Sequence, residues 1–285
     1  MARLTQKEYW DSIHKAKVAK RKRYSVKGNI RILTTRLVEN KLARSYADYL
    51  LWDVIYEKYM PKTKGVKVLE VGSAPGKNLI RLNQRFGFIP YGVEYSDKGV
   101  ELNRKIFIAH NINPDHVIHA DFLSNDFQKQ YSRYFDIVLS AGFIEHFEDV
   151  RDIIEKHINL LTEDGYLIVS IPNLRGANYV WQWILNRELL SMHNVNIMQK
   201  REFSQIFDKV CLSTLFCDYY GTFNFGLFIT KGNSPLRFVL TSCKILQLIL
   251  NMVFRLLFRN GGAESRLFSP YLLFIGVKKS SANTG

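Results

Sequence analysis

Apolar residues follow two alternating patterns through the middle of the chain. Short runs rich in Val, Ile and Leu predict buried strands, and the stretches between them carry apolar residues three and four positions apart, as helices do. The predicted strands are residues 66–71, 90–95, 116–122, 134–141, 166–171, 212–220 and 270–277. This alternation indicates an α/β fold, a doubly wound and mostly parallel sheet with helices on both faces.

The first 60 residues lack strand alternation and carry apolar residues at helical spacing, so we expect an N-terminal helical cap over residues 1–60. Residues 61–285 then form one compact unit, because a chain of 285 residues suffices for a single large core. Tyr9-Trp10 lies at the start of the cap. These two rings either close over a substrate cleft or pack on the core.

A helical insertion is expected over residues 235–262, just before the last strand. Between Leu236 and Phe258 the polar residues recur every three or four positions and form one narrow stripe on an otherwise apolar helix. The stripe consists of Arg237, Thr241, Lys244, Gln247, Asn251 and Arg255. The longest uncharged run, residues 245–254, is far shorter than the roughly 20 residues of a membrane span, so we expect the helix to lie flat. Its apolar face then covers a bilayer surface, a partner in a homodimer or the protein's own core.

The chain is basic, with a formal net charge of +14. Much of this charge lies in a basic block at residues 15–31, which suits nucleic acid, an anionic bilayer or a phosphorylated substrate, or is a solvated helix face. The three cysteines form no Cys-x-x-Cys pair, and the N-terminal residues show no apolar core of a signal peptide. We therefore expect a cytoplasmic protein, peripheral on the inner face of the membrane if the apolar helix binds lipid.

The turn after the first strand carries the most specific signal. It reads Glu70-Val71-Gly72-Ser73-Ala74-Pro75-Gly76-Lys77-Asn78, and glycines between a strand and a helix let backbone approach a nucleotide. The dinucleotide fingerprint fails because Ala74 and Lys77 replace its second and third glycines, and a phosphate-binding loop needs Ser or Thr where Asn78 stands. Glu70 repels a pyrophosphate but can bind an ammonium group. This combination indicates a ligand with an amino-acid end and an adenosine end.

The turn resembles motif I of the class I S-adenosylmethionine (SAM)-dependent methyltransferases. The resemblance implies SAM as cofactor and a seven-stranded Rossmann-like methyltransferase sheet whose last two strands pair antiparallel. Glu94 ends the second strand, about 20 residues past the glycine turn, where a carboxylate is placed to accept the ribose hydroxyls. In the family pattern an acid after the third strand, here Asp121, contacts the adenine amino group. The cofactor-binding residues so implied are Glu70, Gly72, Ser73, Gly76, Glu94, Tyr95, Asp121, Phe122, Ala141 and Gly142.

The segments after the fourth strand resemble one branch of that family. Glu145-His146, the Glu163-Asp164-Gly165 turn and Pro172-Asn173 are similar to the branch that includes ubiquinone-type and polysaccharide-cluster O-methyltransferases. Adenine and amide N-methyltransferases instead carry Asp/Asn-Pro-Pro-aromatic after the fourth strand. Ribose 2′-O RNA methyltransferases need a catalytic Asp where Ser140 stands. A nucleic-acid methyltransferase therefore remains an alternative that rests on the basic block alone.

We expect methyl transfer to oxygen on a small molecule, a sugar or a lipid-linked acceptor. SAM supplies the leaving group, so the protein positions the acceptor and removes its proton. His146 and His193 are the candidate bases, because neutral imidazole titrates near working pH, although His146 could equally line the adenine or stabilise its own loop. The rival hypothesis is a protein that binds SAM without turnover, as a partner subunit. We expect no metal site, since His116 and His119 face opposite sides of a strand.

Overall fold

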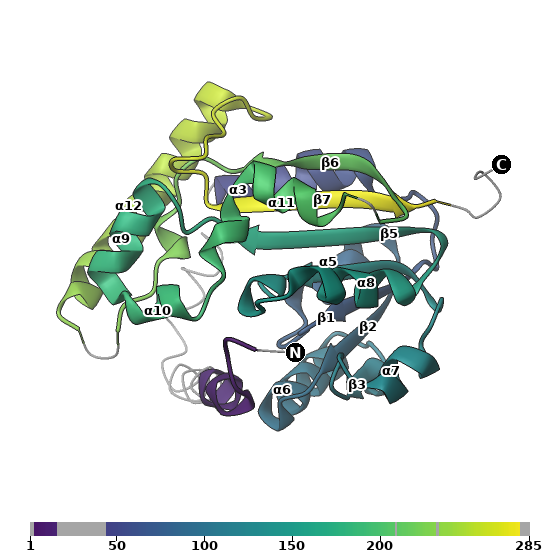
Figure 1. Ribbon diagram of the computed structural model, residues 1–285. Coiled ribbons are helices and arrows are strands. Elements are labelled where there is room, and N and C mark those ends of the chain that lie inside the picture. Colours follow the sequence, from purple (N-terminus) through teal and green to yellow (C-terminus); the bar gives the residue numbers. More distant parts are fainter. Residues whose placement is uncertain (1–2, 16–43, 209, 232–233, 280–285) are drawn as a thin grey trace.

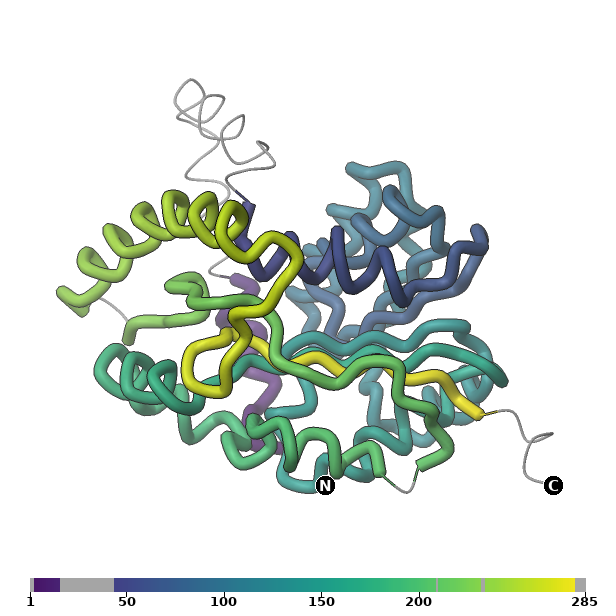
Figure 2. The backbone as a smooth tube through the Cα atoms, turned by 90° about the horizontal axis from the view of Figure 1, so that it is seen from above, coloured from purple at the N-terminus to yellow at the C-terminus, as the bar shows by residue number. Residues whose placement is uncertain are grey.

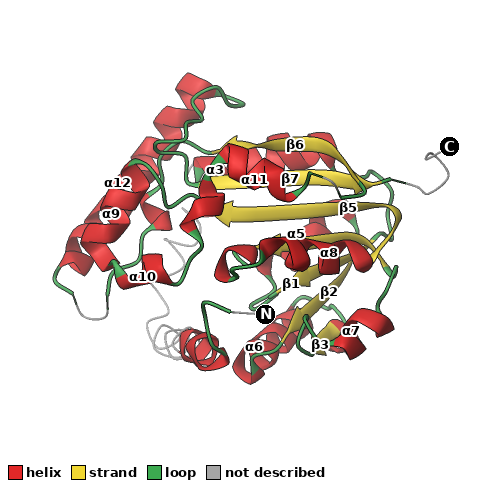
Figure 3. Ribbon diagram, viewed as in Figure 1, coloured by secondary structure: helices red, strands yellow, loops and turns green. Residues whose placement is uncertain are grey.

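The computed structural model describes residues 3–15, 44–208, 210–231 and 234–279. Its centre is a seven-stranded sheet in the order β3-β2-β1-β4-β5-β7-β6 (Figures 1 and 3). The strands are β1 Lys67–Val71, β2 Ile89–Glu94, β3 Val117–His119, β4 Phe135–Ala141, β5 Leu161–Pro172, β6 Leu212–Tyr220 and β7 Tyr271–Lys278. Strands β1 to β5 pair in parallel, and β7 runs antiparallel to both of its neighbours. The predicted fold class, including the antiparallel last strands, is confirmed.

Two apolar cores cover opposite faces of the sheet, because side chains alternate along buried strands. One face packs against α7 Asn125–Gln130, α8 Val150–Asn159 and α11 Lys200–Ile206. The other face packs against α5 Lys77–Phe86, α6 Asp97–Ala109 and a continuous helical segment made of α3 Tyr46–Tyr49, the π-helical turn Leu50–Ile55 and α4 Tyr56–Tyr59. Leu79, Ile80 and Leu82 of α5 are buried.

The start of the chain lies at the carboxyl ends of the strands. Residues 7–15 are helical, and Arg3 forms an isolated bridge with Phe147, just after β4 (Figure 1). Of the expected cap, residues 3–15 and 44–60 are described, and the basic block lies outside the described residues except for Lys15. The division into a cap over residues 1–60 and one compact unit over residues 61–285 stays a prediction.

Strand β5 begins earlier than predicted. The expected Glu163-Asp164-Gly165 turn lies inside the strand, where the pairing with β4 jumps from Phe135↔Leu161 to Ile137↔Tyr166. Asp164 has a φ of 59°, the left-handed region that Asp tolerates better than most residues. The turn signal is therefore real, but it produces an irregularity in a strand that continues past it.

Besides α11 and a short helical turn at Val195–Met198, further helical elements lie between β5 and β7. They are α9 Ala177–Asn186, α10 Glu188–Ser191, a short helical turn at Phe225–Leu227 and α12 Leu236–Phe258. Helices α9 and α12 extend beyond the carboxyl end of β5 in both views (Figures 1 and 2). Leu185 of α9 and Leu240 of α12 share a small apolar cluster with Phe228, so the segment between the two helices packs between them.

Helix α12 attaches to the protein through its polar stripe. Gln247 accepts a hydrogen bond from the backbone N–H of Phe225 at 2.9 Å and donates one to the carbonyl of Phe223 at 3.1 Å. Asn251 Oδ1 accepts from the N–H of Tyr46 at 3.2 Å. The amide side chains of α12 thus form hydrogen bonds with backbone groups of irregular segments, and buried backbone groups need such partners.

The apolar face of α12 points outward. Within the part of the chain that the structure describes, the buried residues of α12 are Leu240, Gln247 and Asn251, whereas Phe238 is 80% exposed and Leu256 76% exposed. Three surfaces were considered for this face: a bilayer, a partner in a homodimer and the protein's own core. The core is therefore the wrong choice. The length and composition of α12 would also allow it to cross a membrane. The sequence had favoured a helix that lies flat, because the longest uncharged run in this segment is short.

Candidate active site

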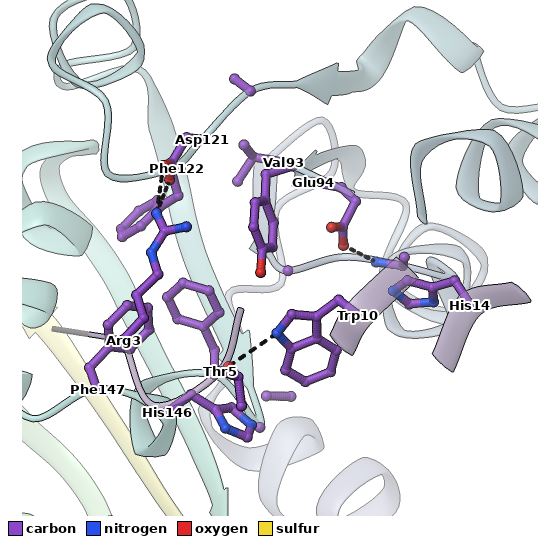
Figure 4. Close-up of a pocket in the computed structure, with 17 residues that line it drawn as sticks. Arg3, Thr5, Trp10, His14, Val93, Glu94, Asp121, Phe122, His146 and Phe147 are labelled. Atoms are coloured by element: carbon purple, nitrogen blue, oxygen red, sulfur yellow. Dashed lines mark hydrogen bonds and ion pairs between the residues drawn. The ribbon is translucent and has the colours of Figure 1, made fainter. Parts of the chain in front are cut away.

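A cavity of about 230 Å³ lies at the carboxyl ends of β1, β2 and β4, where open α/β sheets bind ligands (Figure 4). Most of the predicted cofactor-binding residues line this first cavity. They are Gly72, Glu94, Tyr95, Asp121, Phe122, Ala141 and Gly142. Glu70, Ser73 and Gly76 are outside its lining and act on its shape and charge from close by.

Glu94 is held at the end of β2 by backbone N–H groups. Its Oε1 accepts from the N–H of Ser96 at 2.9 Å, and its Oε2 accepts from the N–H of Ala74 at 3.4 Å (Figure 4). Burial raises the pKa of the Glu94 carboxyl, and the backbone donors oppose that rise. The carboxylate is therefore fixed on the wall of the first cavity, as a group that binds vicinal hydroxyls must be.

Glu70 presents an unpaired carboxylate oxygen near the end of β1. Its Oε1 accepts from Nδ2 of Asn78 at 2.6 Å, whereas its Oε2 is buried without a partner among the residues described. Burial raises the pKa of Glu70 to about 8. A buried acceptor without a donor is unfavourable by roughly 1–3 kcal/mol, and an ammonium group would supply the missing donors. The residues present therefore fit a ligand with an amino-acid end.

The glycine turn contains two positions that require glycine. Gly76 has a φ of +86°, and a side chain there would clash with Oδ1 of Asn103 on α6. Gly72 has a φ of +67°, and a Cβ there would lie 3.2 Å from the ring of Phe143. Ser73 Oγ accepts from Nδ2 of Asn103 at 2.6 Å. The turn is thus fixed against α6 and lines the first cavity with backbone.

Asp121 follows β3 and forms an ion pair with Arg3, a residue that no motif had marked. Nη2 of Arg3 lies 2.7 and 2.5 Å from the two carboxylate oxygens (Figure 4). Oδ1 also accepts from the N–H of Leu123 at 3.0 Å. The guanidinium lies 5.2 Å from the centroid of the Tyr95 ring. The acid expected at the adenine is therefore in the first cavity and is partly neutralised by the N-terminal segment.

The N-terminal segment forms one wall of the first cavity. Thr5, Trp10 and His14 line it together with Arg3. Trp10 Nε1 donates to Oγ1 of Thr5 at 3.2 Å, and the indole meets the ring of His146 edge to face at 5.1 Å (Figure 4). Of the two roles considered for Tyr9-Trp10, closing a cleft is the one that this arrangement supports.

A second cavity of about 650 Å³ shares part of its wall with the first. Trp10, Ala141, Gly142 and His146 line both cavities, so these residues form the boundary. The second cavity extends to Ile229, in the segment that packs between α9 and α12. Its size lies within the roughly 300–1,000 Å³ typical of ligand pockets. Two ligands can therefore meet at the boundary, one from each side.

His146 and His193 lie together in the second cavity, with ring centroids 4.6 Å apart. Nδ1 of His146 is 2.9 Å from the carbonyl of Met192, and Nδ1 of His193 is 2.7 Å from the carbonyl of Leu189. A carbonyl only accepts, so each Nδ1 carries the proton and each Nε2 keeps a free lone pair. Burial lowers the pKa of both imidazoles, that of His146 to about 4. The pair is neutral at pH 7.

Glu145 lines the second cavity beside this pair and was missed as a site residue. The Glu-His dipeptide of the family branch was the signal that could have found it. His116 and His119, considered for a metal, are separate as expected: His116 Nδ1 is 3.1 Å from the carbonyl of Pro90, and His119 Nε2 is 3.1 Å from Asp97. Sequence spacing could not reveal the cluster of Glu145, His146 and His193, because His193 lies far from the other two residues in the chain.

The fold is that of solved SAM-dependent methyltransferases. A SAM-dependent methyltransferase from Archaeoglobus fulgidus superposes with a TM-score of 0.51 at 17% identity, covering 86% of this chain and 99% of that protein. The geranyl diphosphate C-methyltransferase of Streptomyces coelicolor A3(2), solved with Mg²⁺, geranyl diphosphate and S-adenosyl-L-homocysteine, gives 0.53 at 14% identity, covering 81% and 78%.

A family model described as a methyltransferase domain matches residues 34–212. That match spans more than half of the chain, which therefore belongs to this family of class I SAM-dependent methyltransferases. The chain is also 23% identical over 130 residues to the ubiquinone biosynthesis O-methyltransferase of Pelagibacter ubique (strain HTCC1062), covering 42% of this chain and 52% of that protein. It thus spans about half the length of this curated relative.

Proposed function

We propose that the protein transfers the methyl group of SAM to an oxygen of a small-molecule, sugar or lipid-linked acceptor, with a lipid-linked acceptor favoured. One observation carries this proposal: the second cavity meets the cofactor cavity at His146 and extends to Ile229, between the apolar helices α9 and α12. An acceptor that enters beside these helices reaches the methyl donor at that boundary. The partial similarity to a ubiquinone biosynthesis O-methyltransferase supports oxygen as the methylated atom.

The cofactor supplies an activated methyl group together with its own leaving group. In the proposed arrangement Glu70 holds the ammonium end and Glu94 accepts from the ribose hydroxyls, since these carboxylates face the turn and the first cavity respectively. Asp121, paired with Arg3 in this structure, contacts the adenine amino group. The protein then acts by orientation, because a near-attack geometry alone can account for much of the barrier reduction in a displacement reaction.

His146 and His193 are proposed to act on the acceptor hydroxyl. A hydroxyl oxygen attacks the methyl carbon well only as it loses its proton, and a positioned proton acceptor contributes roughly 10²–10⁴-fold. The two free Nε2 lone pairs lie in the second cavity, and His146 also lines the first. The acceptor oxygen is therefore proposed to sit next to His146, where the two cavities meet.

A membrane surface is proposed to cover the apolar faces of α9 and α12. The two helices lie at the same end of the molecule (Figures 1 and 2). Both helices expose large apolar side chains. These residues include Tyr179, Val180, Trp183 and Ile184 on α9 and Phe238, Ile245, Ile249, Leu256 and Leu257 on α12. Removing each from water is worth roughly 1.5–3 kcal/mol, and Trp and Tyr favour membrane interfaces. We infer a cytoplasmic enzyme bound to the inner face of the membrane. The alternative is that a second copy of the chain covers the apolar faces of α9 and α12 in a homodimer.

Labelled SAM tests the reaction. The protein is incubated with methyl-labelled SAM and either a membrane-lipid extract or the aqueous extract of the same cells, and the labelled product is identified by mass spectrometry. We expect the label on an oxygen of a lipid-soluble product. Glu94→Ala serves as the control with weakened cofactor binding, and it should incorporate less label when SAM is kept at a low concentration. Label confined to water-soluble products contradicts the lipid-linked acceptor, and no label in either extract favours a protein that binds SAM without turnover.

Liposomes test the surface. We expect the wild-type protein to sediment with liposomes that contain anionic lipid, and Leu246→Glu combined with Ile249→Glu to abolish this, because both side chains are exposed on the apolar face. Thr241→Glu with Ser242→Glu is the matched control, with the same charges on exposed polar positions of the same helix. If the wild type ignores liposomes and the first variant instead loses a dimer in light scattering, the cover is a second copy.

A further inference from the structure

Three side chains in the second cavity are arranged like the ligands of a metal ion. Glu145, His146 and His193 each offer one ligand atom, and within the described residues these atoms all lie within 4.8 Å of one another. All three residues line the second cavity. Two imidazoles and one carboxylate are the donor set of catalytic sites that keep coordination positions open for water or substrate.

Each imidazole is already oriented as a metal ligand needs. Its Nδ1–H donates to a backbone carbonyl, that of Met192 for His146 and that of Leu189 for His193. This bond leaves Nε2 unprotonated and fixes the plane of the ring, which is the role that backbone carbonyls play behind ligating histidines. The two rings are therefore pre-arranged to present lone pairs rather than N–H groups.

Glu145 gives an independent sign of a cation-binding site. The residue is 1% exposed, and its Oε2 has no hydrogen-bond partner in the described ranges. A carboxylate so placed is strongly unfavourable unless it is paired with a cation or stays protonated. The two imidazoles beside it cannot help while each Nδ1 already donates to a carbonyl, since neutral Nε2 donates nothing.

The backbone fixes the two ligand segments to each other. The N–H of Asn194 donates to the carbonyl of Glu145 at 2.7 Å, and Nδ2 of Asn194 donates to the carbonyl of Phe147 at 3.3 Å. These bonds join the loop after β4 to the residue next to His193. The cluster therefore rests on a rigid connection between distant segments, as a pre-formed ligand set should.

We propose that Glu145, His146 and His193 bind a divalent transition-metal ion of the Zn²⁺ type, and that the acceptor hydroxyl takes an open coordination position on it. This inference deepens the proposed function and rests on it for the acceptor. A metal-bound hydroxyl loses its proton far more readily than a free one, so the ion takes over the task assigned above to an imidazole. The ion changes neither charge nor oxidation state during methyl transfer.

The step balances with SAM as the only co-reactant. The acceptor O–H bond breaks and its proton leaves to water in the second cavity. The oxygen then forms a bond to the methyl carbon while the carbon–sulfur bond breaks and its electron pair goes to sulfur. The products are the methyl ether and S-adenosylhomocysteine, and the neutral ether oxygen binds the ion more weakly than the alkoxide it replaces. The preferred acceptor is accordingly a hydroxyl compound rather than an amine.

Cobalt titration tests the site. Protein stripped of metal with a chelator is titrated with Co²⁺ and followed by its visible absorption, and with Zn²⁺ by calorimetry. We expect one ion per chain, and at least tenfold weaker binding in Glu145→Gln and in His193→Ala. His119→Ala is the control, since it removes a histidine outside the cluster. Zn²⁺ should also raise the unfolding temperature of the wild type and of the control but not of the two variants.

The outcomes separate this inference from the proposed function. If the wild type binds neither ion, or if both variants bind as tightly as the wild type, the metal site is wrong, whatever methyl transfer shows. SAM binding measured in the same variants checks the fold, and it should be unchanged because the first cavity keeps its carboxylates. If the ion binds as expected but no hydroxyl compound is methylated, the site stands and the proposed function fails.

Discussion

The two cavities that meet at His146 are built in different ways. Apart from the N-terminal segment, the first cavity, proposed for the cofactor, is lined by the ends of strands and the loops that follow β1 to β4, within residues 72–147. The second cavity, proposed for the acceptor, is lined by residues from Tyr9 to Tyr271 and depends on how distant helices pack. Strand ends therefore position the first cavity locally, whereas the second exists only in the assembled tertiary structure.

The polar side chains of the two cavities also differ in their hydrogen-bond partners. Glu94 accepts from two backbone N–H groups, so a single fold element holds the carboxylate. His146 and His193 instead donate to carbonyls of the α10 region, which turns acceptor lone pairs toward the cavity. The cofactor side is thus arranged to hold hydroxyl and ammonium donors, and the acceptor side is arranged to hold a proton or a cation. Each of the following changes acts on one side of this comparison.

The largest effect is expected on the acceptor side. His146→Gln or His193→Gln should lower turnover by roughly 10²–10⁴-fold with SAM affinity retained, because the group that takes or displaces the acceptor proton is lost. Single-turnover rates and calorimetry separate the two effects. His119→Gln, a change on β3 outside both cavities, is the control. Near-normal turnover in both variants means that the proton leaves without either imidazole.

The next effect, on the cofactor side, depends on pH. Burial raises the pKa of Glu70 from 4.5 to about 8 in the cofactor-free fold, so the native state holds a proton that the unfolded chain releases. Between these two values the free energy of unfolding falls as pH rises. Glu70→Gln removes this fall, worth on the order of a few kcal/mol at pH 8. Urea unfolding without SAM at pH 5 and pH 8 measures it, and parallel pH dependence in both proteins contradicts it.

A smaller effect is expected from the ribose contact. Glu94→Ala should weaken SAM binding by about 1.5–3 kcal/mol, the range for hydrogen bonds to a charged group. Calorimetry measures the affinity, and Asp97→Ala, an exposed acid at the start of α6, is the control. Unchanged affinity in Glu94→Ala would remove this carboxylate from the cofactor site.

The comparison also explains what could be predicted from the sequence. The strands, the glycine turn and Glu94 follow from local pattern, because parallel strands place their carboxyl ends at one edge whatever the rest of the chain does. Asp121 was assigned through the family resemblance. Arg3 and His193 reach the site through tertiary contacts that leave no periodic signal. His193 was noted for its chemistry alone, and Glu145 was quoted only as part of a family resemblance.

The orientation of α12 shows the same limit. Its periodicity predicted the helix, its bounds and its polar stripe. Which face turns inward depended instead on backbone groups elsewhere, the N–H groups of Phe225 and Tyr46, which the amides of Gln247 and Asn251 satisfy. The hydrophobic pattern alone left a bilayer, a dimer partner and the protein's own core open for the apolar face, and the buried backbone hydrogen bonds determine that the polar stripe turns inward.

The smallest predicted effect tests this orientation of α12. Lys244 Nζ donates to the carbonyl of Phe228 at 3.3 Å, and the Arg255 guanidinium lies 4.5 Å from the Tyr49 ring centroid, so these two basic side chains contact the protein. Arg237 and Lys244 are both exposed, but among the described residues the Arg237 side chain forms no such contact. A basic side chain near an anionic bilayer contributes roughly 1 kcal/mol. Arg237→Gln should therefore weaken liposome binding by up to about that amount at low salt, and Lys244→Gln should weaken it less. Equal, salt-sensitive losses in both variants would place the stripe against lipid and contradict the docked orientation of α12.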